Sequence, residues 1–187
     1  MTPEVARAVE VVRAGGVVGL PTDTVYGIGV DPLQEEAVAR LFELKGRPPA
    51  RPIGILVASL EKARNLGQIE GLALELARAH WPGALTLVVH ARVILPDWVG
   101  DRNARTVGLR VPDHPVALEL LEAAGPMSVT SANLTGRPEA MSDVEAREIF
   151  GDRVFYVPGV SPGGAPSTVV DVTGSRPVVL RQGPVRL

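Results

Sequence analysis

Hydroxyl, carboxylate and phenol side chains follow one another closely in the segment 21–27, whose sequence is Pro-Thr-Asp-Thr-Val-Tyr-Gly. The apolar run 16–20 precedes it and has the length and composition of a short buried strand. Pro21 cannot donate a hydrogen bond to a sheet ladder, so we expect the strand to end there. Polar side chains at the end of a buried strand are where an open α/β sheet usually binds its ligand. Thr22, Asp23 and Thr24 could instead only cap a turn, and both interpretations remain open at this point.

Three cations lie within one short segment: Lys45, Arg47 and Arg51. Arginine binds phosphate oxygens in a bidentate way, and lysine acts on them as a point charge. The segment therefore suits a polyanion such as a nucleotide. The alternative is a solvated basic turn, because the helix dipole favours cations at the C-terminus of the helix that we expect before this segment.

Four other residues could contribute to the same site. Ser131 and Asn133 follow a predicted strand, so we expect their side chains at the same crevice as segment 21–27, with an ordinary turn as the alternative. Arg110 lies inside the otherwise apolar strand 107–111. An unpaired cation there would be costly. Its partner could be Asp113 or another internal carboxylate, or the carboxylate of a ligand, and Arg181 after the apolar run 178–180 poses the same choice.

Several common catalytic sites do not fit the sequence. The chain has no cysteine and no P-loop, and its three histidines are scattered without the spacing of a zinc protease, so a zinc enzyme is not expected. Residues 159–163 match the Gly-x-Ser-x-Gly pattern of hydrolases. However, Pro162 has no N–H for an oxyanion hole and no histidine follows Ser161, so we do not expect a serine nucleophile.

Helix and strand patterns alternate along most of the chain, and strands dominate its end. Predicted helices cover about 2–15, 31–45, 59–67, 72–80, 115–125 and 142–150. Predicted strands cover 16–20, 53–57, 85–90, 106–111, 127–130, 154–157, 168–172 and 178–181. We expect an α/β fold with one twisted, open, mixed sheet and helices packed on it.

Composition sets limits on the class of protein. A chain of 187 residues with 45% hydrophobic content can form one domain with a substantial core. No apolar run is long enough to span a membrane and the N-terminus does not resemble a signal peptide, so we expect a cytoplasmic protein without membrane contact. The net charge of −2 provides no overall attraction to nucleic acid.

Four motifs in order resemble the YrdC/Sua5 family: segment 21–27, Lys-Gly-Arg-Pro at 45–48, Ser-Ala-Asn at 131–133 and Ser-Thr-Val-Val-Asp at 167–171. The match runs from about residue 16 to residue 183. It implies a single YrdC-like domain over 1–187 with a concave basic cleft. Leu56 stands where longer Sua5 proteins often carry a histidine, and the chain stops shortly after Gly183. It therefore resembles the short TsaC-type proteins, and we expect no Sua5-type C-terminal domain.

The resemblance implies an enzyme, an L-threonylcarbamoyladenylate synthase. Such an enzyme converts L-threonine, bicarbonate and ATP with Mg2+ into threonylcarbamoyl-AMP and pyrophosphate. A tRNA-modifying threonylcarbamoyltransferase complex then uses the product to make N6-threonylcarbamoyladenosine at A37 of tRNA. Two alternatives remain. The basic concavity could bind double-stranded RNA or tRNA through phosphates, or the chain could be a YciO-like paralogue that acts on a different carbamoyl-type adenylate.

The resemblance also implies a role for individual residues. It assigns catalysis to Lys45 and Arg47, which together with Arg181 would neutralise the triphosphate and the leaving pyrophosphate, and it implies no metal ligand from the protein. Asp23 could orient the threonine amine or a metal-bound water. The implied nucleotide-binding residues are Lys45, Arg47, Arg51, Thr106, Ser131, Asn133 and Arg181, and the implied threonine-binding residues are Thr24, Arg110, Thr130 and Ser167.

Overall fold

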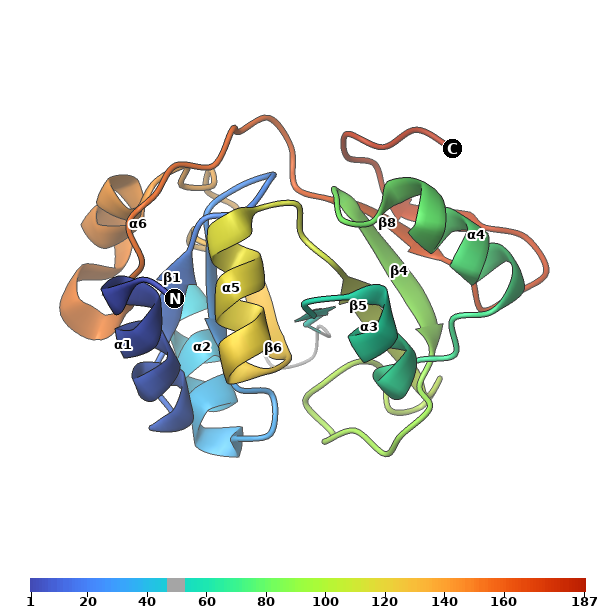
Figure 1. The fold of residues 1–187 in the computed structure, drawn as a ribbon, viewed down its shortest axis with the longest axis horizontal. Coiled ribbons are helices and arrows are strands. Elements are labelled where there is room, and N and C mark those ends of the chain that lie inside the picture. The colour runs from blue at the N-terminus through green and yellow to red at the C-terminus, as the bar shows by residue number, and fades with distance from the viewer. Residues whose placement is uncertain (47–52) are drawn as a thin grey trace.

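A mixed sheet is the centre of the molecule in the computed structural model, which describes residues 1–46 and 53–187 (Figure 1). Within these residues the sheet has nine strands in the order β7-β1-β2-β6-β3-β5-β4-β8-β9. The strands are β1 (Val18–Leu20), β2 (Gly27–Val30), β3 (Ile55–Leu56), β4 (Leu85–His90), β5 (Thr106–Arg110), β6 (Met127–Ser131), β7 (Phe155–Tyr156), β8 (Thr168–Asp171) and β9 (Val178–Arg181). The predicted mixed, open α/β sheet is confirmed.

Six α-helices and one 3-10 turn, Gly151–Arg153, accompany the sheet in the described residues. Ser59 and Ser142 cap two of these helices, because each side chain accepts a hydrogen bond from a backbone N–H of the first turn. One helix ends at Gly46, which adopts the left-handed conformation with φ of 56°. The helices are α1 (Pro3–Arg13), α2 (Glu35–Lys45), α3 (Leu60–Leu66), α4 (Gly71–His80), α5 (Pro115–Ala124) and α6 (Asp143–Phe150).

The strand β2 was not predicted from the sequence. Two of its four residues are glycines, which are poor strand formers. In the structure they allow a close approach: a Cβ added at Gly27 or Gly29 would lie 2.8 or 2.7 Å from the side chain of Val129 in β6. Packing against β6 therefore determines this strand, and local propensity does not.

The strand pairing shows which residues share a face of the sheet, because directly paired residues point to the same side. On one face, α1 and α5 cover β1 and β6 through a cluster that includes Val18, Leu20 and Met127. Figure 1 shows these two helices next to each other in front of β1 and β6. The pocket side of β5, with Thr106, Gly108 and Arg110, belongs to this same face. Among the described residues, no helix packs on this part of the face, so this part stays open.

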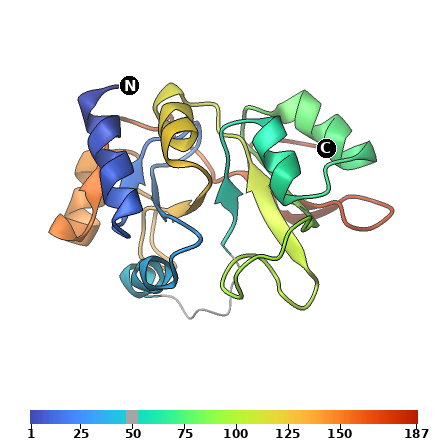
Figure 2. The ribbon, with the colours of Figure 1, turned by 60° about the horizontal axis from the view of Figure 1, so that its bottom comes forward.

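The opposite face is covered along both halves of the sheet. The helices α3 and α4 pack on β4 and β5, and α2 and α6 pack on β1 and β2. Figure 2 shows α3 and α4 with one half of the molecule and α1, α2, α5 and α6 with the other. Within the described residues, no helix has the length and apolar composition that crossing a membrane requires.

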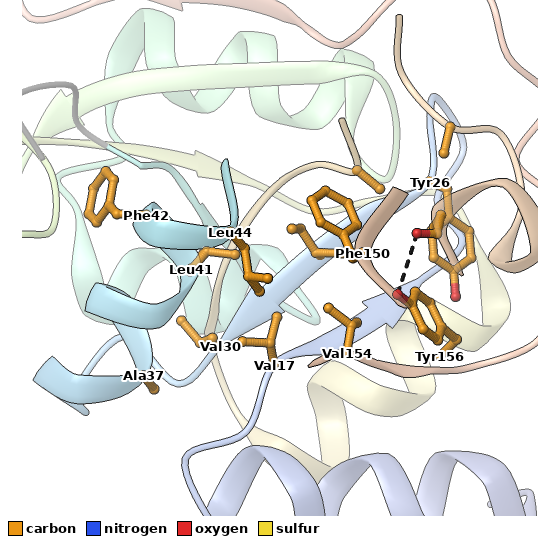
Figure 3. Close-up of a cluster of buried hydrophobic side chains, with 14 of the residues drawn as sticks. Val17, Tyr26, Val30, Ala37, Leu41, Phe42, Leu44, Phe150, Val154 and Tyr156 are labelled. Carbon is orange, nitrogen blue, oxygen red and sulfur yellow. Dashed lines mark hydrogen bonds between the residues drawn. The ribbon is translucent and has the colours of Figure 1, made fainter. Parts of the chain in front are cut away.

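Tyr26, the phenol of segment 21–27, belongs to the core. Figure 3 shows it in one cluster with Val17, Phe150 and Tyr156. It is fully buried, and its hydroxyl donates to the carbonyl of Val157 at 2.6 Å. Burial raises the pKa of Tyr26, with a further increase from Asp143. This phenol therefore stays protonated and positions the segment without taking part in chemistry.

Candidate functional site

A cavity of about 570 Å3 opens on the uncovered part of the sheet face. Its floor comes from β3, β4, β5, β6 and β8, and one side of it comes from segment 21–27. The cavity brings together most of the described site residues predicted from the sequence. The predicted residues that line it are Thr24, Thr106, Arg110, Thr130, Ser131, Ser167 and Arg181.

Arg110 is the buried cation at one end of this cavity, with 6% exposure. Its Nε donates to the carbonyl of Gly83 at 2.9 Å, and its two terminal nitrogens donate to Thr24 Oγ1 at 3.1 Å and Asp23 Oδ1 at 2.5 Å. Burial lowers the pKa of Arg110, and the charge of Asp23 and its hydrogen bond oppose that decrease. The structure thus identifies the internal carboxylate partner of Arg110 as Asp23. Asp113 contributes its backbone N–H, which donates to Asp23 Oδ1 at 3.0 Å.

The hydroxyls of Thr22 and Thr24 form a directed chain that ends at Arg110. Thr22 donates to the carbonyl of Val25 at 2.7 Å, so its proton is used there. The 3.1 Å contact between the two hydroxyls must then use the proton of Thr24. Thr24 also accepts from Arg110. A ligand that contacts the hydroxyl of Thr24 therefore has to donate to its remaining lone pair, as an ammonium or hydroxyl group can.

Ser161, the serine of the hydrolase-like pattern, has a structural role. It is 2% exposed, and its Oγ accepts from the backbone N–H of Thr22 at 3.0 Å. This contact anchors segment 21–27 to the loop before β8. The prediction that Ser161 is no nucleophile agrees with this placement.

We expect Ser161→Ala to destabilise the fold without impairing the chemistry of each folded molecule. The substitution leaves the buried N–H of Thr22 without its acceptor, which costs about 1–3 kcal/mol. Chemical denaturation would measure that loss. Turnover normalised to folded protein should stay unchanged, and an inactive but folded Ser161→Ala variant would contradict the structural role.

Lys45 connects α2 to the end of β6. Its side chain is buried, and Nζ donates to the carbonyl of Ser131 at 2.7 Å and to Asn133 Oδ1 at 2.5 Å. The hydroxyl of Ser131 donates to the same Asn133 oxygen at 2.8 Å. The Asn133 amide nitrogen donates to the carbonyl of Arg137 at 2.6 Å, which fixes its orientation. The Lys45 and Ser131–Asn133 motifs, 86 residues apart along the chain, therefore form one cluster.

Arg181 lies nearer to Arg110 than to this lysine cluster. It belongs to β9, the strand next to β8 in the sheet, and it pairs with Val169 of β8. Its guanidinium donates twice to the carbonyl of Ser167, at 2.8 and 3.0 Å, and once to Ser167 Oγ at 3.1 Å. Burial lowers the pKa of Arg181, and the charge of Glu139 opposes this decrease. Arg181 also lowers the pKa of Arg110, which agrees with two cations at the same end.

Three predicted residues have no side chain placed on the cavity floor. Arg47 and Arg51 lie outside the described residues. Thr130 lines the cavity, but it pairs with Ile28 of the core cluster on the opposite face. Register therefore directs its side chain away from the floor, and we expect its contact with a ligand to come from the main chain.

Sequence reasoning missed the cavity side of β4. Thr86, Val88 and His90 line the cavity there, and the Thr86 and Ser167 hydroxyls lie 2.8 Å apart. The signal was present in the sequence, because the apolar residues Leu85, Leu87 and Val89 alternate there with Thr86 and His90. This alternation with a period of two indicates a strand with one face on the core and the other on a site.

The described residues contain no group of three or more His, Cys, Asp or Glu side chains that could hold a metal ion. The two aspartates that line the cavity, Asp101 and Asp171, each accept hydrogen bonds from their own loops.

Comparisons with known proteins identify a family model and relatives that match nearly the whole chain. The Sua5/YciO/YrdC family model, which carries the description telomere recombination, matches residues 10–183. A Mycobacterium tuberculosis relative is 47% identical over 185 residues, which cover 97% of this chain and 84% of that protein. A Bacillus subtilis threonylcarbamoyl-AMP synthase is 36% identical over 191 residues, which cover 97% of this chain and 54% of the Bacillus protein.

Two solved structures have the same fold. P. abyssi Sua5 complexed with L-threonine superposes with a TM-score of 0.87 at 36% identity, and the match covers 97% of this chain and 55% of Sua5. E. coli YciO superposes with a TM-score of 0.86 at 31% identity, and the match covers 96% of this chain and 88% of YciO. The family model spans most of the chain, and the two relatives match nearly all of it. The chain therefore belongs to the Sua5/YciO/YrdC family.

Proposed function

We propose that this protein is an L-threonylcarbamoyladenylate synthase, which converts L-threonine, bicarbonate and ATP into threonylcarbamoyl-AMP and pyrophosphate. The observation that carries the proposal is Arg110, a buried cation held at one end of a hydroxyl-lined cavity. The Bacillus relative that carries this activity in its name supports the reaction. The related Sua5 structure with L-threonine supports the choice of amino acid.

Arg110 has the donors that a threonine carboxylate needs. A guanidinium carries five N–H groups, and the contacts to Gly83, Thr24 and Asp23 use three of them. The other two can pair with a carboxylate. The hydroxyl of Thr24 has one lone pair left, which can accept a hydrogen bond from the amine or the hydroxyl of threonine. Ser167 and the main chain of Thr130 complete this end of the cavity.

The lysine cluster is the proposed nucleotide end. Lys45, Ser131 and Asn133 lie there together, with Thr106 on the same side of the cavity floor. Arg47 and Arg51 follow Lys45 in the chain, and we assign them to the phosphates by charge and sequence position. Arg181 lies at the amino-acid end, so its charge would act on the α-phosphate and the carbamate more than on the distal phosphates.

The reaction needs positioning and charge and no protein nucleophile. The threonine amine forms a bond to the carbon of bicarbonate, and water leaves to give the carbamate. A carbamate oxygen then forms a bond to the α-phosphorus while the bond from that phosphorus to pyrophosphate breaks. Fixed cations stabilise the charge that develops on the leaving group, and binding both substrates in one cavity supplies proximity.

We propose that Mg2+ enters with ATP as part of the nucleotide substrate. Mg2+ prefers oxygen ligands and is usually bound through substrate phosphates together with one or two carboxylates. We further propose that the product passes to a threonylcarbamoyltransferase complex for tRNA modification.

A second candidate, a YciO-like paralogue with a different carbamoyl-type adenylate, is favoured by the likeness to E. coli YciO. The RNA-binding alternative has less support. Lys45 and Arg110 are buried and paired within the protein, whereas a surface that tracks an RNA backbone needs exposed cations.

Pyrophosphate release separates these functions. We expect release from ATP and Mg2+ to require both L-threonine and bicarbonate in the wild type and to collapse in Arg47→Ala. Turnover of ATP that is indifferent to L-threonine would indicate the paralogue. Folded protein with no turnover but with salt-sensitive binding of double-stranded RNA would indicate the RNA-binding function.

A further inference from the structure

The loop that joins α4 to β4, residues 81–84, lies against Arg110 at one end of the cavity. Within this loop, Gly83 uses both of its main-chain polar groups on two consecutive residues. Its carbonyl accepts from Arg110 Nε at 2.9 Å, and its N–H donates to the carbonyl of Val111 at 2.8 Å. Gly83 therefore contacts the side chain of the buried arginine and the main chain directly after it.

The loop has anchors of its own. Trp81 Nε1 donates to the carbonyl of Leu85 in β4 at 2.7 Å. The carbonyl of Ala84 accepts from the N–H of Thr168 in β8 at 2.9 Å. These contacts attach the loop to two neighbouring strands of the sheet. The carbonyl of Gly83 consequently has a fixed place relative to the cavity floor.

Packing at position 83 requires a glycine. A Cβ added there would lie 2.5 Å from the main-chain oxygen of His80, the last residue of α4. A main-chain oxygen cannot rotate away as the end of a flexible side chain can. A larger residue would therefore displace the loop, and with it the carbonyl that Arg110 contacts. A substitution at this position moves an acceptor of Arg110 without changing any side chain of the site.

The contact with Gly83 decides which part of the Arg110 guanidinium is available to a ligand. A guanidinium carries one hydrogen on Nε and two on each terminal nitrogen. Gly83 uses the hydrogen of Nε, so a carboxylate cannot pair with that edge. Thr24 and Asp23 each use one hydrogen of a different terminal nitrogen. The two free hydrogens are therefore one on each terminal nitrogen.

The three acceptors hold Arg110 from two directions. Thr24 and Asp23 belong to segment 21–27 between β1 and β2, whereas Gly83 directly precedes β4, the neighbour of β5 on its other side. Contacts with one segment alone would let the guanidinium follow the movements of that segment. Acceptors from both sides fix its orientation before a ligand arrives, and a preorganised group loses less side-chain freedom on binding.

We propose that Gly83 is a positioning residue for amino-acid binding. Its carbonyl holds the Arg110 guanidinium so that the two terminal nitrogens meet the carboxylate of the substrate. This role rests on the proposed function, in which that carboxylate belongs to L-threonine. Gly83 is not among the described residues that line the cavity, so it acts through Arg110 and does not touch the substrate.

Gly83→Ala tests the proposal through a difference between the two ligands. The dissociation constant of L-threonine should rise about 10-fold or more, the effect of losing one hydrogen bond to a charged group. The dissociation constant of Mg–ATP should keep its wild-type value, and calorimetric titration measures both. In steady-state assays, KM for L-threonine should rise more than kcat falls, because saturating L-threonine can restore the contact.

A second readout needs no substrate. The Nε–H of Arg110 should be protected from hydrogen exchange in the wild type, since it is buried and donates to Gly83. Gly83→Ala should reduce that protection, which nitrogen-15 NMR of the arginine side chains would measure. Trp81→Phe is a milder second variant, because it removes the 2.7 Å contact with Leu85 and keeps an aromatic ring. It should raise the dissociation constant of L-threonine in the same direction.

The matched control is Gly71→Ala. Gly71 is the first residue of α4 with φ of 50°, and a Cβ added there would meet no atom within 4 Å. Alanine at a positive φ strains the backbone, so this variant should have a lower melting temperature than the wild type. It should leave both dissociation constants and the protection of the Arg110 Nε–H unchanged.

Wild-type affinity for L-threonine in folded Gly83→Ala would overturn the proposal. Equal losses of L-threonine and ATP binding, or the same loss in Gly71→Ala, would overturn it as well, because they would show general damage. If Gly83→Ala does not fold, unchanged L-threonine binding in Trp81→Phe would be decisive against it. A wild type that does not bind L-threonine would instead remove the proposed function, and the protection of the Arg110 Nε–H would still decide whether Gly83 positions the guanidinium.

Discussion

Arg110→Ala is expected to abolish threonine-dependent pyrophosphate release and to lower the free energy of unfolding by about 3–5 kcal/mol. The loss of stability follows from Asp23, whose carboxylate would remain nearly buried without its partner at 2.5 Å. The loss of activity follows from the guanidinium, which has two N–H groups left for a carboxylate ligand. Urea unfolding measures the first effect and the pyrophosphate assay the second.

The double variant Arg110→Ala with Asp23→Ala separates the two effects. It removes both charges, so it should be more stable than the sum of the two single losses predicts. Its activity should remain absent, because the donors for the threonine carboxylate are still missing. Threonine-dependent turnover in the stable double variant would contradict the assignment of Arg110 to the amino acid.

Lys45→Met is expected to reduce kcat about 100- to 1,000-fold, the range seen when a preorganised charge-stabilising group is removed. Methionine preserves most of the length of the side chain. Asn133 Oδ1 would still accept from Ser131 at 2.8 Å, so most of the cluster should persist. The variant should therefore stay folded while it loses the charge that we propose acts on the triphosphate. Single-turnover kinetics with saturating substrates would measure the chemical step.

Lys62 provides the matched control for Lys45. It is the only other lysine in the sequence, and it lies exposed on α3. Lys62→Met removes the same charge from the net total, so it should leave kcat unchanged. Equal losses in the two variants would show that the overall charge matters and that the position of Lys45 does not.

Residues at the ends of strands could be assigned to the site from the sequence, whereas the contacts of individual side chains could not. Ser131 and Thr24 were expected at one crevice because each follows a predicted strand, and both line the cavity. The sequence left the partner of Arg110 open between Asp113, another internal carboxylate and the carboxylate of a ligand. Asp23 lies 87 residues away in the chain, and no local pattern distinguishes it from its alternatives.

The glycines show the same limit from another side. In the sequence, Gly27, Gly29 and Gly108 differ only in their neighbours. Packing against Val129 explains the first two, whereas a Cβ added at the third would make only ordinary contacts, the nearest at 3.4 Å. The pairing of β2 with β6, and of β5 with β3 and β4, distinguishes these positions, since the register decides what each missing side chain would have met.

The mass of the nucleotide product tests the central claim most directly. Wild-type protein would be incubated with ATP, Mg2+, isotopically labelled bicarbonate and labelled L-threonine, and the products analysed by liquid chromatography and mass spectrometry. We expect threonylcarbamoyl-AMP that contains both labels and is absent when either substrate is left out. An adenylate without the threonine label, or AMP alone from active protein, would contradict the proposed function.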